Sequence, residues 1–316
     1  MTGAPLSTSL AGWELPSPLM VASGCAGSGR ELAAWCDLSA LGALVTRSVT
    51  LDPRAGHAPP RVVESPSGVL HSNGLQNPGL QGFLATELPW LVQQRVRTAV
   101  SIAGATLGEY AELGRRVAQA PGVAAVEVNL GCADREHHDR EFGADPYLTG
   151  KVVAAVRREV PRGVTVLAKL RIGDGPLGDL ARAAVDAGAE VLVVGNPPHG
   201  LSFDPALRPL LGAVTGYVSG PAVQPMALHA LWQLHRALPD VPLVGGGGVR
   251  RGADVVAMLA AGASAVQIGT ALLTDPDAPG RIATELVDEL DRLGGSGPAR
   301  VPDLVGAAHR REGDSQ

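Results

Sequence analysis

The chain has 316 residues, 45% of them hydrophobic and 3% aromatic, and its formal net charge is −5. This length and apolar content are enough for one large core and exclude global disorder. The acidic balance and the scarcity of aromatic residues argue against nucleic-acid binding, which uses a basic stripe and often stacking side chains. We therefore expect no nucleic-acid partner.

The three cysteines, Cys25, Cys36 and Cys132, are too few and too scattered for a disulfide framework. They form no CxxC pair and no Cys/His spacing typical of structural zinc, so we expect no metal. Residues 1–19 contain neither a basic stretch followed by an apolar run nor a membrane-spanning length of apolar residues. We therefore expect a cytoplasmic protein that does not associate with membranes.

Short apolar runs rich in β-branched residues alternate with Ala-, Leu- and Arg-rich stretches, a pattern typical of parallel strands joined by helices. We predict eight strands, at Leu19–Ala22, Ala43–Arg47, Thr98–Ile102, Ala125–Asn129, Thr165–Leu170, Val191–Val194, Val241–Gly245 and Ala265–Gly269. We predict helices at Arg30–Cys36, Glu109–Gln119, Pro146–Glu159, Leu177–Ala187, Pro225–Ala237 and Ala253–Ala260. This alternation favours an α/β fold, the (β/α)8 or TIM barrel, in a single domain of residues 1–293. An open doubly wound sheet is the rival, but no GxGxxG run follows the first strand.

Three segments do not fit simple turns. The connections at 50–88 and 131–145 are long, and a barrel keeps its chemistry in long loops at the carboxyl ends of its strands. Residues 294–316 are polar, contain Gly and Pro and show no periodicity, so we expect a loosely ordered tail.

Glycines end the last two predicted strands, in VPLVGGGGV (Val241–Val249) and AGASAVQIGTAL (Ala261–Leu272). Backbone N–H groups exposed there can hold a phosphate, helped by a helix N-terminus. Tight strand-to-helix turns alone would also explain the glycines. Because both units carry them where barrels usually bind phosphate, the pattern favours a phosphate site without identifying the molecule.

Polar residues follow other strands. Lys169 lies in the apolar strand VLAKLRI, where desolvation is costly unless the ammonium faces an anionic partner such as a cofactor ring or a substrate carboxylate. A Lys that extends to the rim is the alternative. Asn129 ends a strand and Cys132 follows in the long loop, where the thiol is a base, a nucleophile or an inert side chain. Asn196 follows another strand and can bind a heterocycle or cap a turn.

Two loops carry weaker signals. The run LHSNGLQNPG (Leu70–Gly79) contains the turn formers Asn-Gly and Asn-Pro-Gly, whose backbone N–H groups could bind a carboxylate or an imide. The loop around His137 and His138, with Asp134 and Asp139, resembles a metal site only loosely, and a solvated polar loop explains it better.

Taken in order, these motifs resemble those of the class 1 dihydroorotate dehydrogenases over about residues 15–273. The resemblance is carried by ASGCAGSGRE, DLSALGALVTRSVT, PPRVVESPSGVLHSNGLQNPG, SIAG, VNLGC, AKL, GNP, SGPAVQP, GGGGV and AGASAVQIGT. GLQNPG and ASAVQIGT are specific in combination. LQNPG and SGPAVQP are closer to the subtype that pairs with an iron–sulfur/FAD electron-transfer subunit.

The resemblance implies an FMN-dependent barrel that oxidises dihydroorotate to orotate in pyrimidine biosynthesis. It implies that Cys132 takes the C5 proton while a hydride leaves C6 for the flavin N5, which would need a depressed or matched thiol pKa. Lys169 would face the isoalloxazine ring and stabilise its reduced anion. The residues implied around FMN are Ala22, Ser23, Gly24, Arg47, Ser48, Ser101, Asn129, Lys169, Ser219, Gly220, Gly247, Gly248, Gly269 and Thr270. Those implied around the substrate are Arg47, His71, Ser72, Asn73, Gly74, Leu75, Asn129, Asp134 and Asn196.

The departures from the family pattern concern the substrate. Arg47 stands where the family usually has Lys, and His71 and Asp134 stand where it has Asn. Arg keeps the charge of Lys but differs in shape, and Asp replaces an amide by an acceptor-only anion. An Asp facing orotate would be repulsive unless it is protonated or turned away. These changes indicate either an altered substrate or an ordinary member with compensating changes.

Several hypotheses stay open beside dihydroorotate oxidation. The same flavin barrel could act on another dihydropyrimidine or a specialised metabolite. A flavin-free phosphate-binding lyase or isomerase is a second alternative, and a non-catalytic binding subunit, against which Cys132 and Lys169 argue, is a third. The chain has no cysteine cluster and no FAD or NAD motif, so coupling to NAD would need a partner subunit. Barrels of this kind often pair, and we expect a homodimer.

Overall fold

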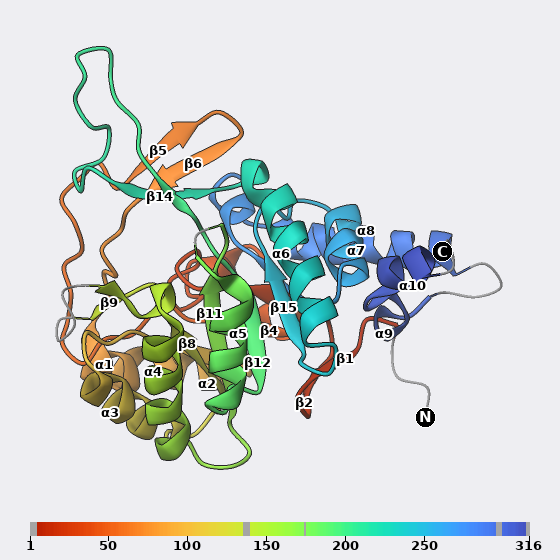
Figure 1. The fold of residues 1–316 in the computed structure, drawn as a ribbon, viewed down its shortest axis with the longest axis horizontal. Coiled ribbons are helices and arrows are strands. Elements are labelled where there is room, and N and C mark those ends of the chain that lie inside the picture. Colours follow the sequence, from red (N-terminus) through yellow and green to blue (C-terminus); the bar gives the residue numbers. More distant parts are fainter. Residues whose placement is uncertain (1–4, 135–139, 174, 295–298, 314–316) are drawn as a thin grey trace.

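The computed structural model describes residues 5–134, 140–173, 175–294 and 299–313. Eight parallel strands close into a barrel and neighbour each other in chain order (Figure 1). The barrel strands are β3 (Leu19–Val21), β4 (Ala43–Val45), β7 (Thr98–Ile102), β8 (Val123–Asn129), β11 (Thr165–Arg171), β12 (Val191–Asn196), β15 (Leu243–Gly246) and β16 (Ala263–Ile268). Each overlaps its predicted strand, which confirms the (β/α)8 barrel.

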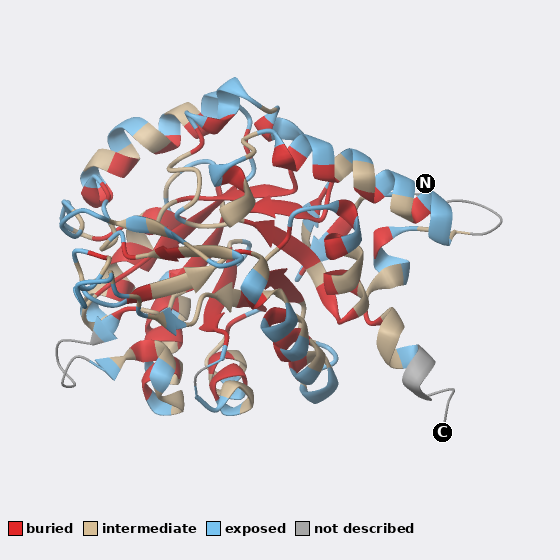
Figure 2. Cartoon of the chain, turned by 90° about the horizontal axis from the view of Figure 1, so that it is seen from above, coloured by how far each residue is buried: buried red, intermediate tan, exposed pale blue. Residues whose placement is uncertain are grey.

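Helices cover the outside of the barrel. They are α3 (Leu107–Ala118), α4 (Pro146–Glu159), α5 (Leu177–Asp186), α6 (Gln224–Ala237), α7 (Gly252–Ala260) and α8 (Ala278–Leu293), preceded by the shorter α1 (Gly79–Gly82) and α2 (Leu88–Gln93). Local signals fix their starts: the Thr106 hydroxyl caps α3, and Asp145 caps α4 just before Pro146. Figure 2 shows the buried residues gathered in the barrel strands and on the helix faces that pack against them.

One predicted helix needs correction, and one helix was not predicted. The segment Arg30–Cys36 forms only a short 3₁₀ turn, Leu32–Ala34, in which Leu32 is the one buried side chain, so it lacks an apolar stripe to hold a longer helix. The predictions also omitted α8, although Ile282, Leu286 and Leu290 recur at helical spacing and are buried.

Smaller sheets close the two ends of the barrel. The hairpin of β1 (Thr8–Leu10) and β2 (Trp13–Leu15) places Leu10 and Leu15 against the apolar interior at one end. At the other end lies an antiparallel sheet in the order β13-β14-β6-β5, made of β13 (His199–Gly200), β14 (Gly216–Ser219), β6 (Gly68–His71) and β5 (Val62–Ser65). The short pair β9 (Ala133–Asp134) and β10 (Arg140–Glu141) also lies there.

The C-terminal segment is more ordered than we expected. It contains α9 (Val301–Leu304) and α10 (Ala307–Gly313). Val301 is fully buried and its N–H donates to the Pro5 carbonyl at 3.0 Å. The His309 ring stacks on Trp232 of α6, with ring centroids 3.6 Å apart. Two anchors thus hold these short helices, in a segment too short to show periodicity.

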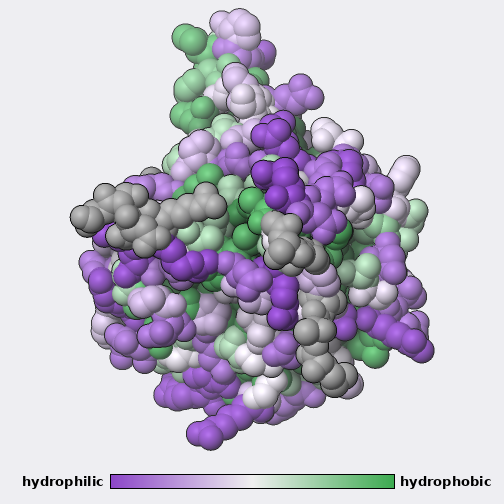
Figure 3. Space-filling view, turned by 90° about the vertical axis from the view of Figure 1, so that its right-hand side faces the viewer, coloured by the Kyte–Doolittle hydropathy of each residue, from purple (hydrophilic) through white to green (hydrophobic). Residues whose placement is uncertain are grey.

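An arm projects from the molecule between β13 and β14, at the top of Figure 1. Its large apolar side chains Leu201, Phe203, Leu207 and Val214 are exposed. The projection shows hydrophobic surface in Figure 3.

None of the helices in the described ranges combines the length and the apolar character that crossing a bilayer requires.

Candidate active site

The barrel interior changes from apolar to polar along single strands, because every second residue of a strand faces inward. Three strands show the same order towards the carboxyl end: Ala125, Glu127 and Asn129 on β8, Leu167, Lys169 and Arg171 on β11, and Ala265, Gln267 and Gly269 on β16. The first residue of each set belongs to the apolar interior. The strands therefore direct their functional side chains to one end of the barrel.

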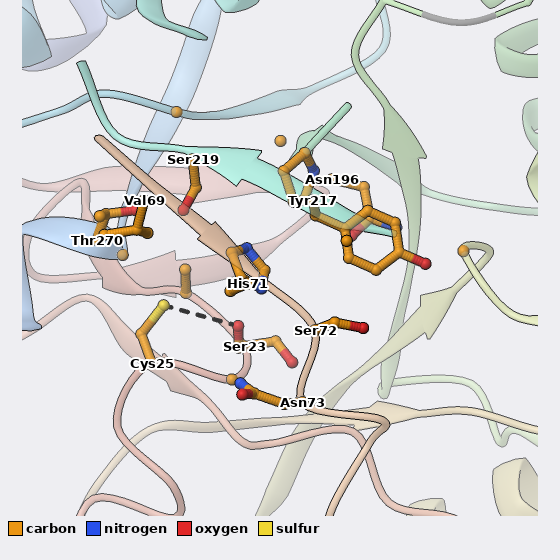
Figure 4. Close-up of a pocket in the computed structure, with 18 of the residues that line it drawn as sticks. Ser23, Cys25, Val69, His71, Ser72, Asn73, Asn196, Tyr217, Ser219 and Thr270 are labelled. Atoms are coloured by element: carbon orange, nitrogen blue, oxygen red, sulfur yellow. Dashed lines mark hydrogen bonds between the residues drawn. The ribbon is translucent and has the colours of Figure 1, made fainter. Parts of the chain in front are cut away.

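A cavity of about 920 Å³ opens at this end, between the strand ends and the sheet of β5, β6, β13 and β14. Every residue predicted from the sequence to touch cofactor or substrate lines it, except Ser101 and Asp134. Ser101 lies behind the wall, and the side chain of Asp134 lies outside the described part of the structure, as do His137, His138 and Asp139. In Figure 4, Ser219 and Thr270 lie towards one end and Asn196 and Tyr217 towards the other, with His71 between them.

A glycine cradle, which we define as Gly247 and Gly248, forms one end of the cavity after β15. Their φ angles are +119° and +75°, a region that side-chain-bearing residues rarely adopt. A Cβ on Gly248 would lie 2.6 Å from Cβ of Gln224, so the chain allows no side chain there. The backbone itself therefore forms this wall, as phosphate binding by N–H groups requires.

A chain of hydrogen bonds orders two amides that line the cavity. Asn196 Nδ2 donates to Asn129 Oδ1 at 3.1 Å, and Asn129 Nδ2 donates to Ser48 Oγ at 3.1 Å. Ser48 Oγ in turn lies 2.9 Å from Ser101 Oγ. Ser101 thus supports the wall rather than forming it.

Lys169 has an anionic partner within the protein. Its Nζ lies 3.4 Å from Glu127 Oε1 and 3.2 Å from Gln267 Oε1, and all three side chains are buried. The desolvation of the ammonium is therefore offset by a carboxylate as well as by any anion in the cavity.

Cys132 follows β8 and lies at the cavity wall, 7% exposed. Burial raises the pKa of its thiol to about 11, while a hydrogen bond from the Tyr110 hydroxyl and the charges of Arg54 and Arg171 oppose this rise. Glu141 adds to the rise. The thiol is thus neutral near neutral pH, whereas the resemblance implied a depressed or matched pKa for a base.

A charged and aromatic wall, which we define as Glu141, Arg171, His199 and Tyr217, borders the thiol. Arg171 is 6% exposed, donates to Glu141 and to the Pro197 carbonyl, and lies over the Tyr217 ring at 4.9 Å. His199 Nε2 lies 3.3 Å from the other oxygen of Glu141. This wall gives the cavity a fixed guanidinium held in a mostly buried ion pair.

His71 ends β6 and faces the same space, with its ring centroid 5.9 Å from that of Tyr217. Burial lowers its pKa, so the imidazole stays neutral and offers one donor and one acceptor. It can therefore serve the hydrogen-bonding role of an amide. Next to it, Ser72 Oγ lies 2.9 Å from His57 Nδ1, and Arg47 donates to the Gln76 carbonyl at 3.0 Å, so the loop after β6 is held by its own contacts.

Glu127, Arg171 and Gln267 were not predicted from the sequence, although a signal existed. Each lies two positions from a residue that was predicted, on the same face of the same strand. Glu141, His199 and Tyr217 belong to loops or short strands, and no local pattern predicts that they meet. Cys25 also lines the cavity, with Sγ 4.0 Å from the Ser23 carbonyl oxygen (Figure 4).

Metal ligation finds no support in the part of the chain that the structure describes: no three His, Cys, Asp or Glu side chains there are grouped to hold an ion. The three cysteines are free. The cavity brings together the glycine cradle, a buried Lys, an amide pair and a thiol.

Comparison with known proteins gives the family. The family model for dihydroorotate dehydrogenase matches residues 5–290. The chain is 42% identical over 97% of its length to the protein named dihydroorotate dehydrogenase B (NAD(+)), catalytic subunit, of Desulforudis audaxviator, covering 98% of that protein. The proteins of the same name from Pelobacter propionicus and Geobacter sulfurreducens are 42% and 41% identical over 96% of the chain, and 98% and 97% of their own lengths are covered. These matches confirm the resemblance read from the motifs: the chain belongs to the dihydroorotate dehydrogenase family of oxidoreductases.

Proposed function

We propose that this protein oxidises dihydroorotate to orotate with FMN, as the catalytic subunit of a two-component enzyme of pyrimidine biosynthesis. The observation that carries the proposal is the arrangement of one cavity, with the glycine cradle at one end and Cys132, Asn129 and Asn196 grouped at the other. Lys169 also lines this cavity. The relatives' names support the reaction class and the substrate.

The cavity fits FMN at its glycine end. Gly247, Gly248, Gly269 and Thr270 would hold the phosphate through their backbone, and Lys169 would face the isoalloxazine ring. When bound, FMN supplies the acceptor for the hydride that leaves C6 of the substrate. Lys169 brings positive charge to the place where negative charge develops during flavin reduction. Ala22, Ser23, Gly24, Arg47, Ser48, Asn129, Ser219 and Gly220 would complete the cofactor site.

Cys132 takes the C5 proton of the substrate in this proposal. The base is the thiolate, and with a pKa of about 11 the thiolate is a small fraction of the thiol at neutral pH. Tyr110, Arg54 and Arg171 favour the thiolate and limit the cost of forming it. Asn129, Asn196 and the neutral His71 provide donors and acceptors for the ring of the substrate.

Electrons must leave the flavin through another subunit. The chain has three cysteines, too few for an iron–sulfur cluster of the usual four-cysteine type, so we propose a partner that carries an iron–sulfur centre and FAD and passes electrons to NAD. The same proposal includes a homodimer of this chain and a location in the cytoplasm. These features stay predictions.

A second candidate keeps the fold, the cofactor and the base but changes the ring that is oxidised. The wall of Glu141, Arg171, His199 and Tyr217 favours it, since an ion pair beside the thiol adds charge and bulk to the part of the cavity that recognises the substrate. Another dihydropyrimidine or a specialised metabolite is then the substrate.

Anaerobic addition of dihydroorotate to the purified protein tests the proposal directly. We expect a yellow protein whose visible flavin band bleaches rapidly, and orotate as the product. A yellow protein that stays oxidised with dihydroorotate, but bleaches with another dihydropyrimidine, would favour the second candidate. A colourless protein that cannot be loaded with FMN would contradict both.

A further inference from the structure

Three buried polar side chains form a closed ring of hydrogen bonds inside the barrel. Lys169 Nζ donates to Gln267 Oε1 at 3.2 Å and lies 3.4 Å from Glu127 Oε1, and Gln267 Nε2 donates to Glu127 Oε2 at 3.0 Å. The three residues come from β11, β8 and β16, so the ring joins strands that are not all neighbours. We call this set the interior triad.

Barrel stability alone does not explain the interior triad. A buried ion pair loses solvation that its attraction often fails to recover, and apolar replacement of such a pair is often neutral or stabilising. The layer immediately below, which includes Ala125, Leu167 and Ala265, is apolar and fully buried. The same strands could therefore continue as an apolar core, and the triad needs a reason that lies in the cavity.

The position of each member indicates that reason. Lys169 and Gln267 line the cavity, whereas Glu127 does not line it and is 0% exposed. Two of the three N–H groups of the Lys169 ammonium are used by triad members within the described structure. Glu127 thus acts on the cavity only through its neighbours, by fixing the ammonium and by offsetting its charge.

We propose that Glu127 is a positioning residue that sets the electrostatic field of Lys169 at the flavin and, through it, the reduction potential of the flavin. The inference rests on the proposed function, because it places FMN beside Lys169. Two-electron reduction by hydride adds negative charge to the flavin, and a positive charge nearby stabilises the reduced form. The Glu127 carboxylate weakens that field, so it lowers the potential relative to an uncompensated Lys.

The sign of the effect gives a test by two opposite substitutions. Glu127→Gln keeps the shape and one of the two hydrogen bonds that the carboxylate accepts, and it removes the negative charge, so the midpoint potential of bound FMN should rise. Gln267→Glu replaces the amide that donates to Glu127 by a second carboxylate beside Lys169, so at alkaline pH, where both carboxylates are ionised, the potential should fall. We expect each to shift the oxidised-to-reduced equilibrium at least about tenfold, which is about 30 mV for a two-electron couple.

The measurement is an anaerobic redox titration of the FMN-loaded proteins against reference dyes. Glu190→Gln is the matched control, because Glu190 pairs with Arg157 near the opposite end of the barrel and does not line the cavity. Its potential should equal that of the wild type. Equal potentials for Glu127→Gln and wild type, or a fall instead of a rise, would overturn the inference. If Glu127→Gln does not fold, Gln267→Glu decides alone, and an unchanged or raised potential overturns the inference.

The same samples separate this inference from the proposed function. If dihydroorotate leaves the wild-type flavin oxidised while the potentials shift as expected, the substrate assignment fails and the role of Glu127 stands. If dihydroorotate bleaches the wild type while the potentials of the variants do not move, the substrate stands and the role of Glu127 fails. A wild type that cannot be loaded with FMN overturns both.

Discussion

The two halves of the barrel interior use the same strands for different purposes. In the lower half, towards the amino ends of the strands, Ala125, Leu167 and Ala265 pack as apolar core. In the upper half, towards the carboxyl ends, the residues two positions further along the same strands are Glu127, Lys169 and Gln267. The backbone and the register are continuous across this boundary. The difference teaches that inward alternation sets where a side chain points, while the distance along the strand decides whether it stabilises the fold or serves the cavity.

The largest effect should come from removing the thiol in the upper half. Cys132→Ala should lower turnover about 10²–10⁴-fold, the usual contribution of a general base, while flavin content and unfolding temperature change little. Stopped-flow reduction by dihydroorotate and the absorbance ratio of flavin to protein check the two parts. Turnover equal to the wild type would show that another group takes the proton.

The matching change in the lower half should spare chemistry and weaken the fold. Leu167→Ala empties space in a fully buried layer and should cost about 2–5 kcal/mol of unfolding free energy. Urea unfolding measures this cost, and flavin reduction measured well below the unfolding midpoint should stay close to wild type. A large loss of reduction rate in folded protein would mean that the two halves are not separable.

The pH dependence sharpens the assignment of Cys132. A raised pKa means that the thiol form predominates below about pH 11, and the base form is the thiolate. The rate of flavin reduction should therefore rise with pH, approaching tenfold per unit until other groups intervene. A rate that falls between neutral and alkaline pH would be inconsistent with a thiolate base.

A substitution of Arg171 tests whether the charged and aromatic wall binds the substrate. Arg171→Gln should raise the KM for dihydroorotate about tenfold, because hydrogen bonds to charged groups contribute roughly 1.5–3 kcal/mol. It also leaves the half-buried Glu141 without this cation, so the double variant Arg171→Gln with Glu141→Gln should unfold at a higher temperature than the single variant. An unchanged KM in both would place this pair outside substrate recognition.

The smallest effect should come from His71→Asn. The neutral imidazole and an amide each provide a donor and an acceptor, so the KM should change by less than about tenfold. His71→Leu, which provides neither, is the comparison and should raise the KM more. Orotate binding, followed through the flavin spectrum, gives the same comparison without turnover. A larger effect for Asn than for Leu would contradict the role of the imidazole.

Much of the fold was predictable because each barrel strand is a short apolar run bounded by turn-forming or helix-capping residues. The parallel barrel, its eight strands and the cap-initiated α4 follow from periodicity and from signals such as Asp145-Pro146. The C-terminal helices could not be predicted from such signals, because Val301 and His309 are held by residues distant in sequence. Local patterns cannot report such tertiary anchors.

The site residues also divide into those that the sequence predicts and those that depend on tertiary packing. Glycines and strand-end polar residues predicted most of the cavity lining, and the alternation from Lys169 would have added Arg171. The direction of the Cys132 pKa could not be predicted, because burial and the approach of Tyr110 depend on how α3 packs on the barrel. The meeting of Glu141 with Arg171 depends on how the segment after β8 folds over the carboxyl end of β11.

The glycine cradle has an evolutionary consequence. Backbone forms that end of the cavity, and a Cβ at Gly248 meets its surroundings at 2.6 Å, so almost any mutation there is damaging. The opposite end is made of side chains that single codon changes can alter. A lineage of this barrel can therefore explore new substrates while it inherits its cofactor site intact. Directed evolution of the enzyme should accordingly randomise His71, Arg171 and Tyr217 and leave Gly247 and Gly248 fixed.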